Sequence, residues 1–153
     1  MNRRQEVNFW VLYAFIIMFV ASRCFVILFP EINIIVNGNH IHHFAYGFIL
    51  LAIAGLMGLN NVHKTKPRFV AILFGIGLGA AVDEFGMWIR LEDNYWVRES
   101  YDAMIVVTSF LISEVYFGSF WRKIIAWIVY RFFGVRIFAH KPFAKRSLPA
   151  DRV

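Results

Sequence analysis

Three histidines lie within four residues at the start of an apolar stretch: His40, His42 and His43 in the string NGNHIHHFAYG. A second apolar stretch contains two adjacent carboxylates, Asp83 and Glu84, in the string GAAVDEFGMWIR. Imidazole and carboxylate groups supply the ligands that zinc and non-haem iron accept, and they also transfer protons. Because ionisable groups are costly at membrane depth, these residues indicate a functional site if the two stretches meet.

The composition indicates that both stretches belong to a membrane protein. The chain has 153 residues, of which 59% are hydrophobic and 17% are charged, and its mean hydropathy is +0.58. Soluble domains average about 45–50% apolar and about 25% charged residues. The net charge of +6 is therefore interpreted through the positions of Lys and Arg along the chain, and we expect no nucleic-acid binding.

Four apolar stretches have the length of about 20 residues that a transmembrane helix needs. They cover residues 8–29, 41–59, 68–89 and 102–121, within a predicted domain of residues 1–121. Helices are the suitable structure for them, because backbone groups in lipid must be hydrogen-bonded within the segment. We therefore predict an all-α fold, with a four-helix transmembrane bundle.

The C-terminal part of the chain has a different pattern. Residues 122–140 mix basic, aromatic and aliphatic residues, and their longest apolar run is too short to cross a bilayer. This pattern predicts an amphipathic helix in the inner interface, where its Lys and Arg meet anionic lipids. The alternative is that the segment continues the fourth span and ends in a basic cluster. Residues 141–153 are predicted to form a flexible tail.

The charges of the short connections orient the four spans. The first connection, PEINIIVNGNH, has no Lys or Arg, whereas the second contains Lys64, Lys66 and Arg68. Lys and Arg are enriched in cytoplasmic loops, so we predict a protein of the cytoplasmic membrane with both termini in the cytoplasm. The three histidines, the two carboxylates and Arg23 then lie near the outer face. The outer loop EDNYWVRESYD either covers this layer as a lid or lies in the interface.

Glycine spacing predicts how two of these helices pack. Gly75, Gly79 and Asp83 recur every four residues in the third span and therefore share one helix face. His43 and Gly47 begin a similar face on the second span. Since small residues let helices approach closely in lipid, we expect the two faces to meet and to bring His43 toward Asp83.

Three interpretations of this outer layer remain open. In the first, it binds a metal such as Zn2+ or Fe2+. In the second, its groups relay protons or ions without a metal. In the third, it is a structural ion-pair network in which Arg23 or Arg90 neutralises the carboxylates. The metal ligands in the first interpretation are His40, His42, His43 and Asp83.

Two strings carry a resemblance to a known family. HIHHFAYG and VDEFGMWIRLEDNYWVRESYDA are similar to the motifs of a family of small prokaryotic multi-pass membrane proteins with no assigned activity. The resemblance extends over the second to the fourth spans and implies a shared site without naming a reaction. It carries over to His40, His42, His43, Asp83, Glu84, Asp93, Tyr95, Trp96, Ser100 and Asp102. A looser similarity to membrane zinc hydrolases of the alkaline ceramidase type is limited, because this chain has fewer spans and keeps its histidines in one cluster.

These patterns lead to two functional hypotheses. The first is a metal-dependent hydrolase that acts on a lipid or another amphipathic substrate. The second is a non-enzymatic membrane protein, either a metal or proton transporter or an assembly partner; transport through so few spans would require a homo-oligomer. The predicted catalytic residues are Glu84 as the general base, with Ser100 and Asp102 to orient water or substrate. Substrate binding is assigned to Arg23, Tyr95 and Trp96.

Overall fold

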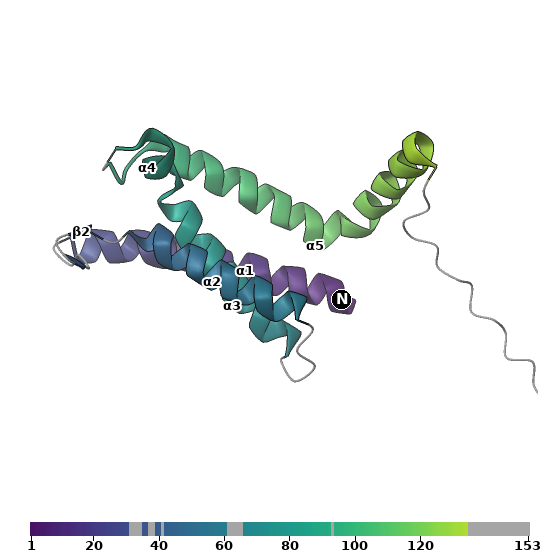
Figure 1. Cartoon of the computed structure of the whole chain (residues 1–153), viewed down its shortest axis with the longest axis horizontal. Coiled ribbons are helices and arrows are strands. Elements are labelled where there is room, and N and C mark those ends of the chain that lie inside the picture. The colour runs from purple at the N-terminus through teal and green to yellow at the C-terminus, as the bar shows by residue number, and fades with distance from the viewer. Residues whose placement is uncertain (31–34, 37–38, 41, 61–65, 93, 135–153) are drawn as a thin grey trace, which may run out of the picture. The chain divides into compact units, whose positions relative to one another are not determined.

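The chain is almost entirely helical in the residues that the structure describes (Figure 1), which confirms the predicted helical fold. This computed structural model describes residues 1–30, 35–36, 39–40, 42–60, 66–92 and 94–134, and only the backbone of residues 35–36 and 39–40. The predicted tail, residues 141–153, lies outside the described residues. The chain divides into two compact units, Met1–Gly118 and Ser119–Val153, and each is described by itself.

Five helices and one short strand pair make up the described part of the chain. The helices are α1 (Arg3–Leu28), α2 (His43–Leu59), α3 (Pro67–Asp83), α4 (Phe85–Arg90) and α5 (Arg98–Phe133). Between α1 and α2, β1 (Ile35–Val36) pairs antiparallel with β2 (Asn39–His40). The predicted spans 8–29, 41–59 and 102–121 overlap with α1, α2 and part of α5, whereas 68–89 does not form one helix.

Local signals determine where the helices begin and end. At the start of α1, the Asn2 side chain accepts a hydrogen bond from the Gln5 N–H, and the Gln5 side chain accepts one from the Asn2 N–H. This reciprocal pair is a capping box, which satisfies two backbone donors that a helix start leaves over. Pro67 occupies the first turn of α3, where its missing N–H costs no hydrogen bond. After α4, Leu91 adopts a left-handed backbone with a φ of 53°, which ends the helix.

The third predicted span is interrupted at Glu84. The expectation of one helix over 68–89 is wrong, because α3 ends at Asp83 and α4 begins at Phe85. The Glu84 backbone has φ −102° and ψ 11°, and its N–H bonds to the Val82 oxygen instead of an oxygen one full helical turn back. Asp83 is therefore the last residue of α3, and Glu84 lies at the junction between the two helices.

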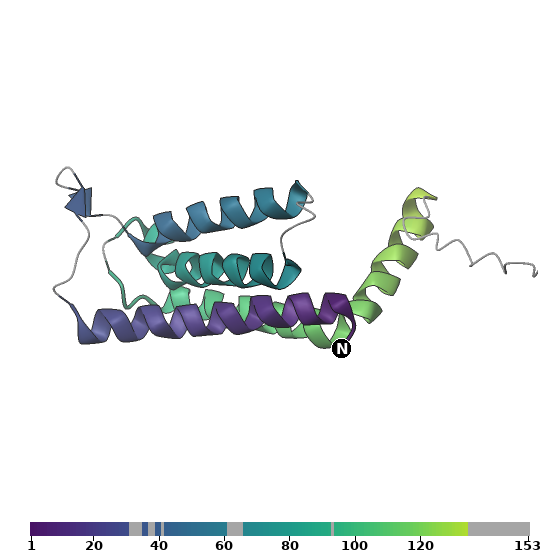
Figure 2. The ribbon, with the colours of Figure 1, turned by 90° about the horizontal axis from the view of Figure 1, so that it is seen from below.

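α3 is the central helix of the first unit and lies between α1 and α2 (Figure 2). A Cβ added at Gly75 or Gly79 would lie 2.5 or 2.7 Å from backbone oxygens of α1. A Cβ added at Gly47 of α2 would lie 2.6 Å from a backbone nitrogen of α3, close to Gly77. The Gly75–Gly79 face therefore packs against α1 and not against the second span as we expected. Gly77 lies on the other side of α3, about 200° around the helix from Gly75, and it meets α2.

A cluster of buried apolar side chains joins three helices of this unit. It contains Phe15 and Phe19 of α1, Val82 of α3 and Leu111 of α5. Phe15 is fully buried, and the others are at most 8% exposed. These side chains hold α1 and α5 against the same end of α3, which is the end where the polar residues lie.

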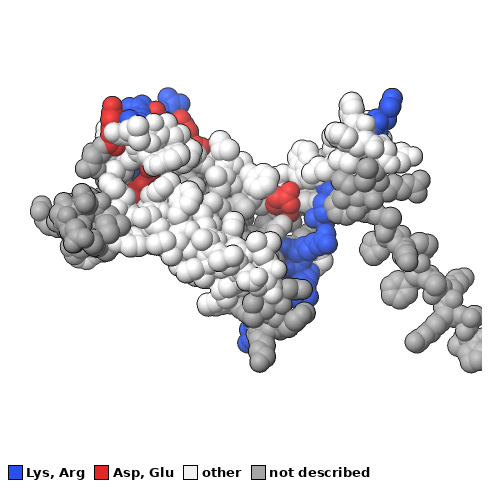
Figure 3. Space-filling model, in the orientation of Figure 1, with Lys and Arg blue, Asp and Glu red and all other residues white. Residues whose placement is uncertain are grey.

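Two described helices, α1 and α5, are long and apolar enough to cross a membrane. Only 28% and 17% of their apolar windows are buried, so most of their apolar side chains are not covered by protein. The apolar helix α2 is shorter, with 17 residues. Figure 3 shows the charged side chains of the first unit mainly at its two ends, over α4 and the start of α5 and near the start of α1. Length and composition thus suggest membrane association for this chain.

Candidate functional site

The junction between α3 and α4 places Asp83 and Glu84 in two separate polar clusters. Each cluster combines side chains from several elements of the first unit. The arginine cluster consists of Arg23, Asp83, Tyr95 and Tyr101. The histidine cluster consists of His42, His43 and Glu84.

In the arginine cluster, a buried ion pair connects α1 to α3. The Nε of Arg23 lies 2.6 Å from the Oδ1 of Asp83, and an Arg23 terminal nitrogen donates to the Asp83 backbone oxygen at 2.6 Å. The Tyr95 hydroxyl donates to the Oδ2 of Asp83, also at 2.6 Å. Asp83 is completely buried, and both of its carboxylate oxygens have partners. Arg90, the other arginine of the ion-pair interpretation, pairs with Glu99.

Aromatic rings surround the Arg23 guanidinium. It lies 4.1 Å from the ring centre of Tyr95 and 4.6 Å from that of Tyr101, distances at which a cation is attracted by the ring face. It also donates to the Tyr95 backbone oxygen at 3.1 Å. Trp96 packs edge-on against Tyr95 and is half exposed. The arginine and tyrosine predicted to bind substrate therefore bind parts of the protein itself.

Burial raises the pKa of the Tyr95 hydroxyl, and its hydrogen bond to Asp83 raises that pKa further. Tyr95 accordingly keeps its proton and acts as a donor to Asp83 at any physiological pH. The loop that contains Tyr95 is fastened to α3 through this hydroxyl and to α1 through its backbone oxygen.

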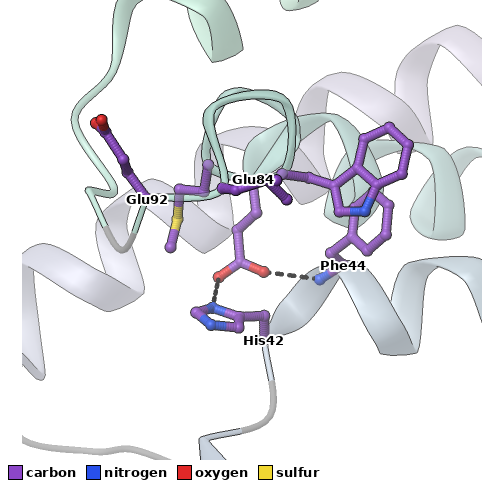
Figure 4. A pocket seen from close by; sticks show the side chains of 7 residues that line it. His42, Phe44, Glu84 and Glu92 are labelled. Atoms are coloured by element: carbon purple, nitrogen blue, oxygen red, sulfur yellow. Dashed lines mark hydrogen bonds and ion pairs between the residues drawn. The ribbon is translucent and has the colours of Figure 1, made fainter.

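In the histidine cluster, one carboxylate oxygen contacts two imidazoles. The Oε1 of Glu84 lies 3.5 Å from the Nδ1 of His42 and 3.3 Å from the Nδ1 of His43. The other oxygen, Oε2, accepts a hydrogen bond from the Phe44 N–H at 2.8 Å, and Figure 4 shows this contact together with that of His42. The Phe44 N–H belongs to the first turn of α2, where backbone donors lack helical partners and negative charge is favoured.

The start of α2 explains how two consecutive histidines reach one carboxylate. On a regular helix their side chains would diverge by about 100°. His42, however, precedes the helix and has an extended backbone, with φ −74° and ψ 151°, whereas His43 is the first helical residue. Apart from Glu84, the two imidazoles have different neighbours. His43 packs against the Phe25 ring of α1, and His42 lines a pocket.

The pocket beside Glu84 has a volume of about 300 Å³. Its apolar part includes Phe44 and Trp88, whose rings stack with their centres 5.6 Å apart. Its polar part comes from two carboxylates and one imidazole, which Figure 4 labels. The residues that line it are His42, Phe44, Glu84, Met87, Trp88, Leu91 and Glu92. Five of these were not predicted as site residues, although Trp88 follows Glu84 by four residues: Phe44, Met87, Trp88, Leu91 and Glu92.

Ser100 and Asp102, predicted as catalytic, lie away from this pocket. Ser100 is completely buried, and its Oγ accepts a hydrogen bond from the Gly86 N–H at 3.0 Å. Asp102 is exposed and pairs with Arg98, four residues before it, at 3.3 Å. Ser100 thus joins the start of α5 to α4, and Asp102 forms a surface ion pair within α5.

The predicted metal ligands are divided between the two clusters. His42 and His43 meet Glu84, whereas Asp83 belongs to the arginine cluster. The side chains of His40 and Asp93 lie outside the described residues. Among the residues that the structure does describe, no group of three or more His, Cys, Asp or Glu side chains is arranged to hold a metal ion. Metal binding therefore stays a prediction from the sequence.

Comparisons with known proteins leave the candidate site to be interpreted from its own chemistry. No protein-family model matches this chain. No curated protein matches it. No solved structure matches it. The family resemblance stays a prediction from the motifs.

Proposed function

We propose that this chain is a multi-pass protein of the cytoplasmic membrane that binds an amphipathic molecule in the pocket beside Glu84 and hydrolyses it. Membrane insertion is supported by α1 and α5, which leave most of their apolar surface uncovered by protein. The Lys and Arg of the second connection support an orientation with this connection and both termini in the cytoplasm. The pocket then opens at the outer end of the bundle.

An amphipathic ligand fits the pocket because one part of its lining is apolar and another is polar. The stacked Phe44 and Trp88 rings provide an apolar wall, and His42 and Glu84 provide the polar one. Binding sites for small molecules commonly combine an apolar lining with a few polar groups in this way. A volume of about 300 Å³ accommodates the polar group of a lipid and the adjoining atoms.

The contact between Glu84 and His42 carries the proposal of hydrolysis. A carboxylate beside the Nδ1 of an imidazole favours the tautomer that carries its proton on Nδ1, and in hydrolases such an imidazole takes a proton from water or a hydroxyl through its Nε2. Glu84 lies behind His42 with its side chain only 6% exposed, while the His42 side chain is 38% exposed. In this proposal His42 is the base and Glu84 positions it, which changes the role that the sequence suggested for Glu84.

Metal-assisted hydrolysis is the second candidate, and the same contact favours it. Histidines that bind metals usually donate their other ring N–H to a carboxylate. His42 and His43 would then hold Zn2+ or Fe2+, and the metal would lower the pKa of a bound water. This candidate differs from the first in requiring both histidines.

Substitution of the two histidines separates these candidates. The full chain in detergent micelles would be assayed with a carboxylic ester, an N-acyl amide and a phosphodiester that each carry a short acyl or aryl group. If His42 is the base, His42→Ala lowers the hydrolysis rate about 100-fold or more, and His43→Ala lowers it much less. If a metal is required, both variants lose the activity together with about one equivalent of bound metal per chain, as metal analysis would detect. A folded wild type that hydrolyses none of the three compounds would contradict both candidates.

A further inference from the structure

The last 15 residues of α5 form an amphipathic basic segment within the second unit. We call the described residues Ser119–Phe133 the basic segment; they include Arg122, Lys123 and Arg131 and no acidic residue. Along the sequence, Lys and Arg recur from Arg122 onward, and no Asp or Glu occurs between Glu114 and Asp151. The charge of this segment is therefore of one sign and is not neutralised by neighbours along the chain.

The helical periodicity of the basic segment separates its polar residues from a purely apolar face. At about 100° per residue, the three basic residues, Ser119 and Tyr130 all fall within one half of the helix. The opposite face is apolar over an arc of about 140°, which exceeds the width of about 100° that a helix needs for an apolar stripe. That face consists of Trp121, Ile124, Ile125, Ile128, Val129 and Phe132.

The length of α5 also bears on where this segment lies. The part of α5 within the first unit, residues 98–118, corresponds to about 31 Å of helical rise, and the hydrocarbon core of a bilayer is about 30 Å thick. If this part crosses the membrane, the basic segment is not needed to span it. Large apolar side chains such as Trp127 and Phe132 are mainly exposed on the basic segment, with 65% and 77% of their surface accessible.

We propose that the basic segment is a binding surface for anionic lipid headgroups, on which it lies with its apolar face in the acyl boundary. An amphipathic helix with cations on its polar face binds in this way, through its buried apolar area and through attraction to anionic lipids. Because the segment carries basic and no acidic residues, a partner of complementary charge is negative. Its apolar face is wide enough to lie against the acyl chains next to the headgroups. The segment thereby anchors the cytoplasmic end of α5, independently of what the outer pocket binds.

Site-specific labels on the full chain test this proposal. In a Cys24→Ser background, Ile128→Cys on the apolar face and Tyr130→Cys on the polar face would each carry an environment-sensitive fluorophore. The chain would be reconstituted in phosphatidylcholine vesicles with or without phosphatidylglycerol. Phosphatidylglycerol should shift the emission of the label at position 128 to the blue and protect it from aqueous iodide, and it should affect the label at position 130 much less.

Charge variants provide the decisive comparison. Each cation near an anionic surface favours the bound form about five-fold, so replacing all three basic residues by Gln should lower the bound-to-free ratio about 100-fold. The matched variant Arg122→Lys/Arg131→Lys keeps the charges and should keep the response to phosphatidylglycerol. Added salt should weaken the response by screening. Protection that is equal with and without phosphatidylglycerol, or that depends on protein concentration because a second copy covers the face, would overturn the proposal.

Discussion

Asp83 and Glu84 are neighbours in the chain, but one belongs to a closed cluster and the other to an open one. Asp83 is completely buried and has a guanidinium and a hydroxyl on its two oxygens. Glu84 is also buried, yet the two imidazoles that contact it have side chains 38% and 32% exposed. A carboxylate with fixed partners on all sides stabilises the fold, whereas one that orients half-exposed imidazoles is able to take part in chemistry. The difference separates a cluster that stabilises the fold from the cluster to which we assign the proposed function.

The arginine cluster should give the largest loss of stability when it is broken. Asp83→Ala leaves the Arg23 guanidinium buried without its carboxylate, and removal of one partner of a buried pair costs about 3–5 kcal/mol. Unfolding of the purified chain in mixed micelles would measure the free energy of unfolding. The double variant Arg23→Met/Asp83→Leu should lose less than Asp83→Ala, because no uncompensated charge remains. A loss below about 1 kcal/mol for Asp83→Ala would mean that this cluster is not what holds α1 to α3.

A substitution that pushes α2 away from α3 should disturb the contacts of the histidine cluster, which joins α2 to Glu84. It should leave the contacts of the arginine cluster, which joins α1 to α3, unchanged. The Cβ in Gly47→Ala would lie 2.6 Å from a backbone nitrogen of α3, so the helices must shift, at a cost of about 1–3 kcal/mol. The matched control is Gly58→Ala on the same helix, whose Cβ meets nothing within 4 Å and which should be neutral or favour the helix by up to about 1 kcal/mol. Thermal unfolding measures both. Equal effects of the two substitutions would contradict the close packing at Gly47.

The fold could be predicted from the sequence further than the site. Apolar length sufficed to locate three of the four predicted helices, because it is a property of whole segments. The break at Glu84 could not be predicted from the apolar run, which continues through it without Pro. The sequence placed Arg23 in the same outer layer as two carboxylates, Asp83 and Glu84, and did not show which of them it pairs with. The packing of α1 against the Gly75–Gly79 face brings Arg23 to Asp83.

The site depends on backbone details that periodicity does not contain. A regular helix at His42 and His43 would have separated the two imidazoles, and only the extended backbone of His42 brings both to Glu84. Ser100 shows a backbone partner that the sequence did not indicate: the hydroxyl predicted as catalytic accepts the N–H of Gly86. Polar side chains at helix ends bind backbone groups as readily as substrates.

Glu84→Gln should reduce the proposed activity strongly and the stability only slightly. The Gln side-chain oxygen still accepts from the Phe44 N–H, so the start of α2 keeps its partner, and we expect a loss of about 1 kcal/mol in the free energy of unfolding. The side chain no longer carries the charge that orients His42, and the hydrolysis rate should fall about 10–100-fold. The matched control, Glu99→Gln, changes a carboxylate that pairs with Arg90 and does not line the pocket. If Glu84→Gln unfolds the chain as well as abolishing activity, Glu84 stabilises the fold in the way that Asp83 does.

The smallest effect is expected at the surface pair of α5. Arg98 and Asp102 have side chains 87% and 55% exposed, and exposed pairs of this kind contribute about 0.2–1 kcal/mol. Asp102→Asn should therefore change the free energy of unfolding by less than about 1 kcal/mol and leave hydrolysis at the wild-type rate. An activity loss comparable to that of His42→Ala would return Asp102 to the catalytic residues.

The attachment of the Tyr95 backbone to Arg23 has a consequence for how a ligand enters. Leu91 and Glu92 form one wall of the pocket, and the segment that follows them is tied to two helices through Tyr95. The opposite wall, His42 and Phe44, is the first turn of α2, which Glu84 holds through the contacts of a single side chain. One wall of the pocket is therefore held more firmly than the other. A ligand larger than the present space must displace the start of α2, which carries the proposed base His42.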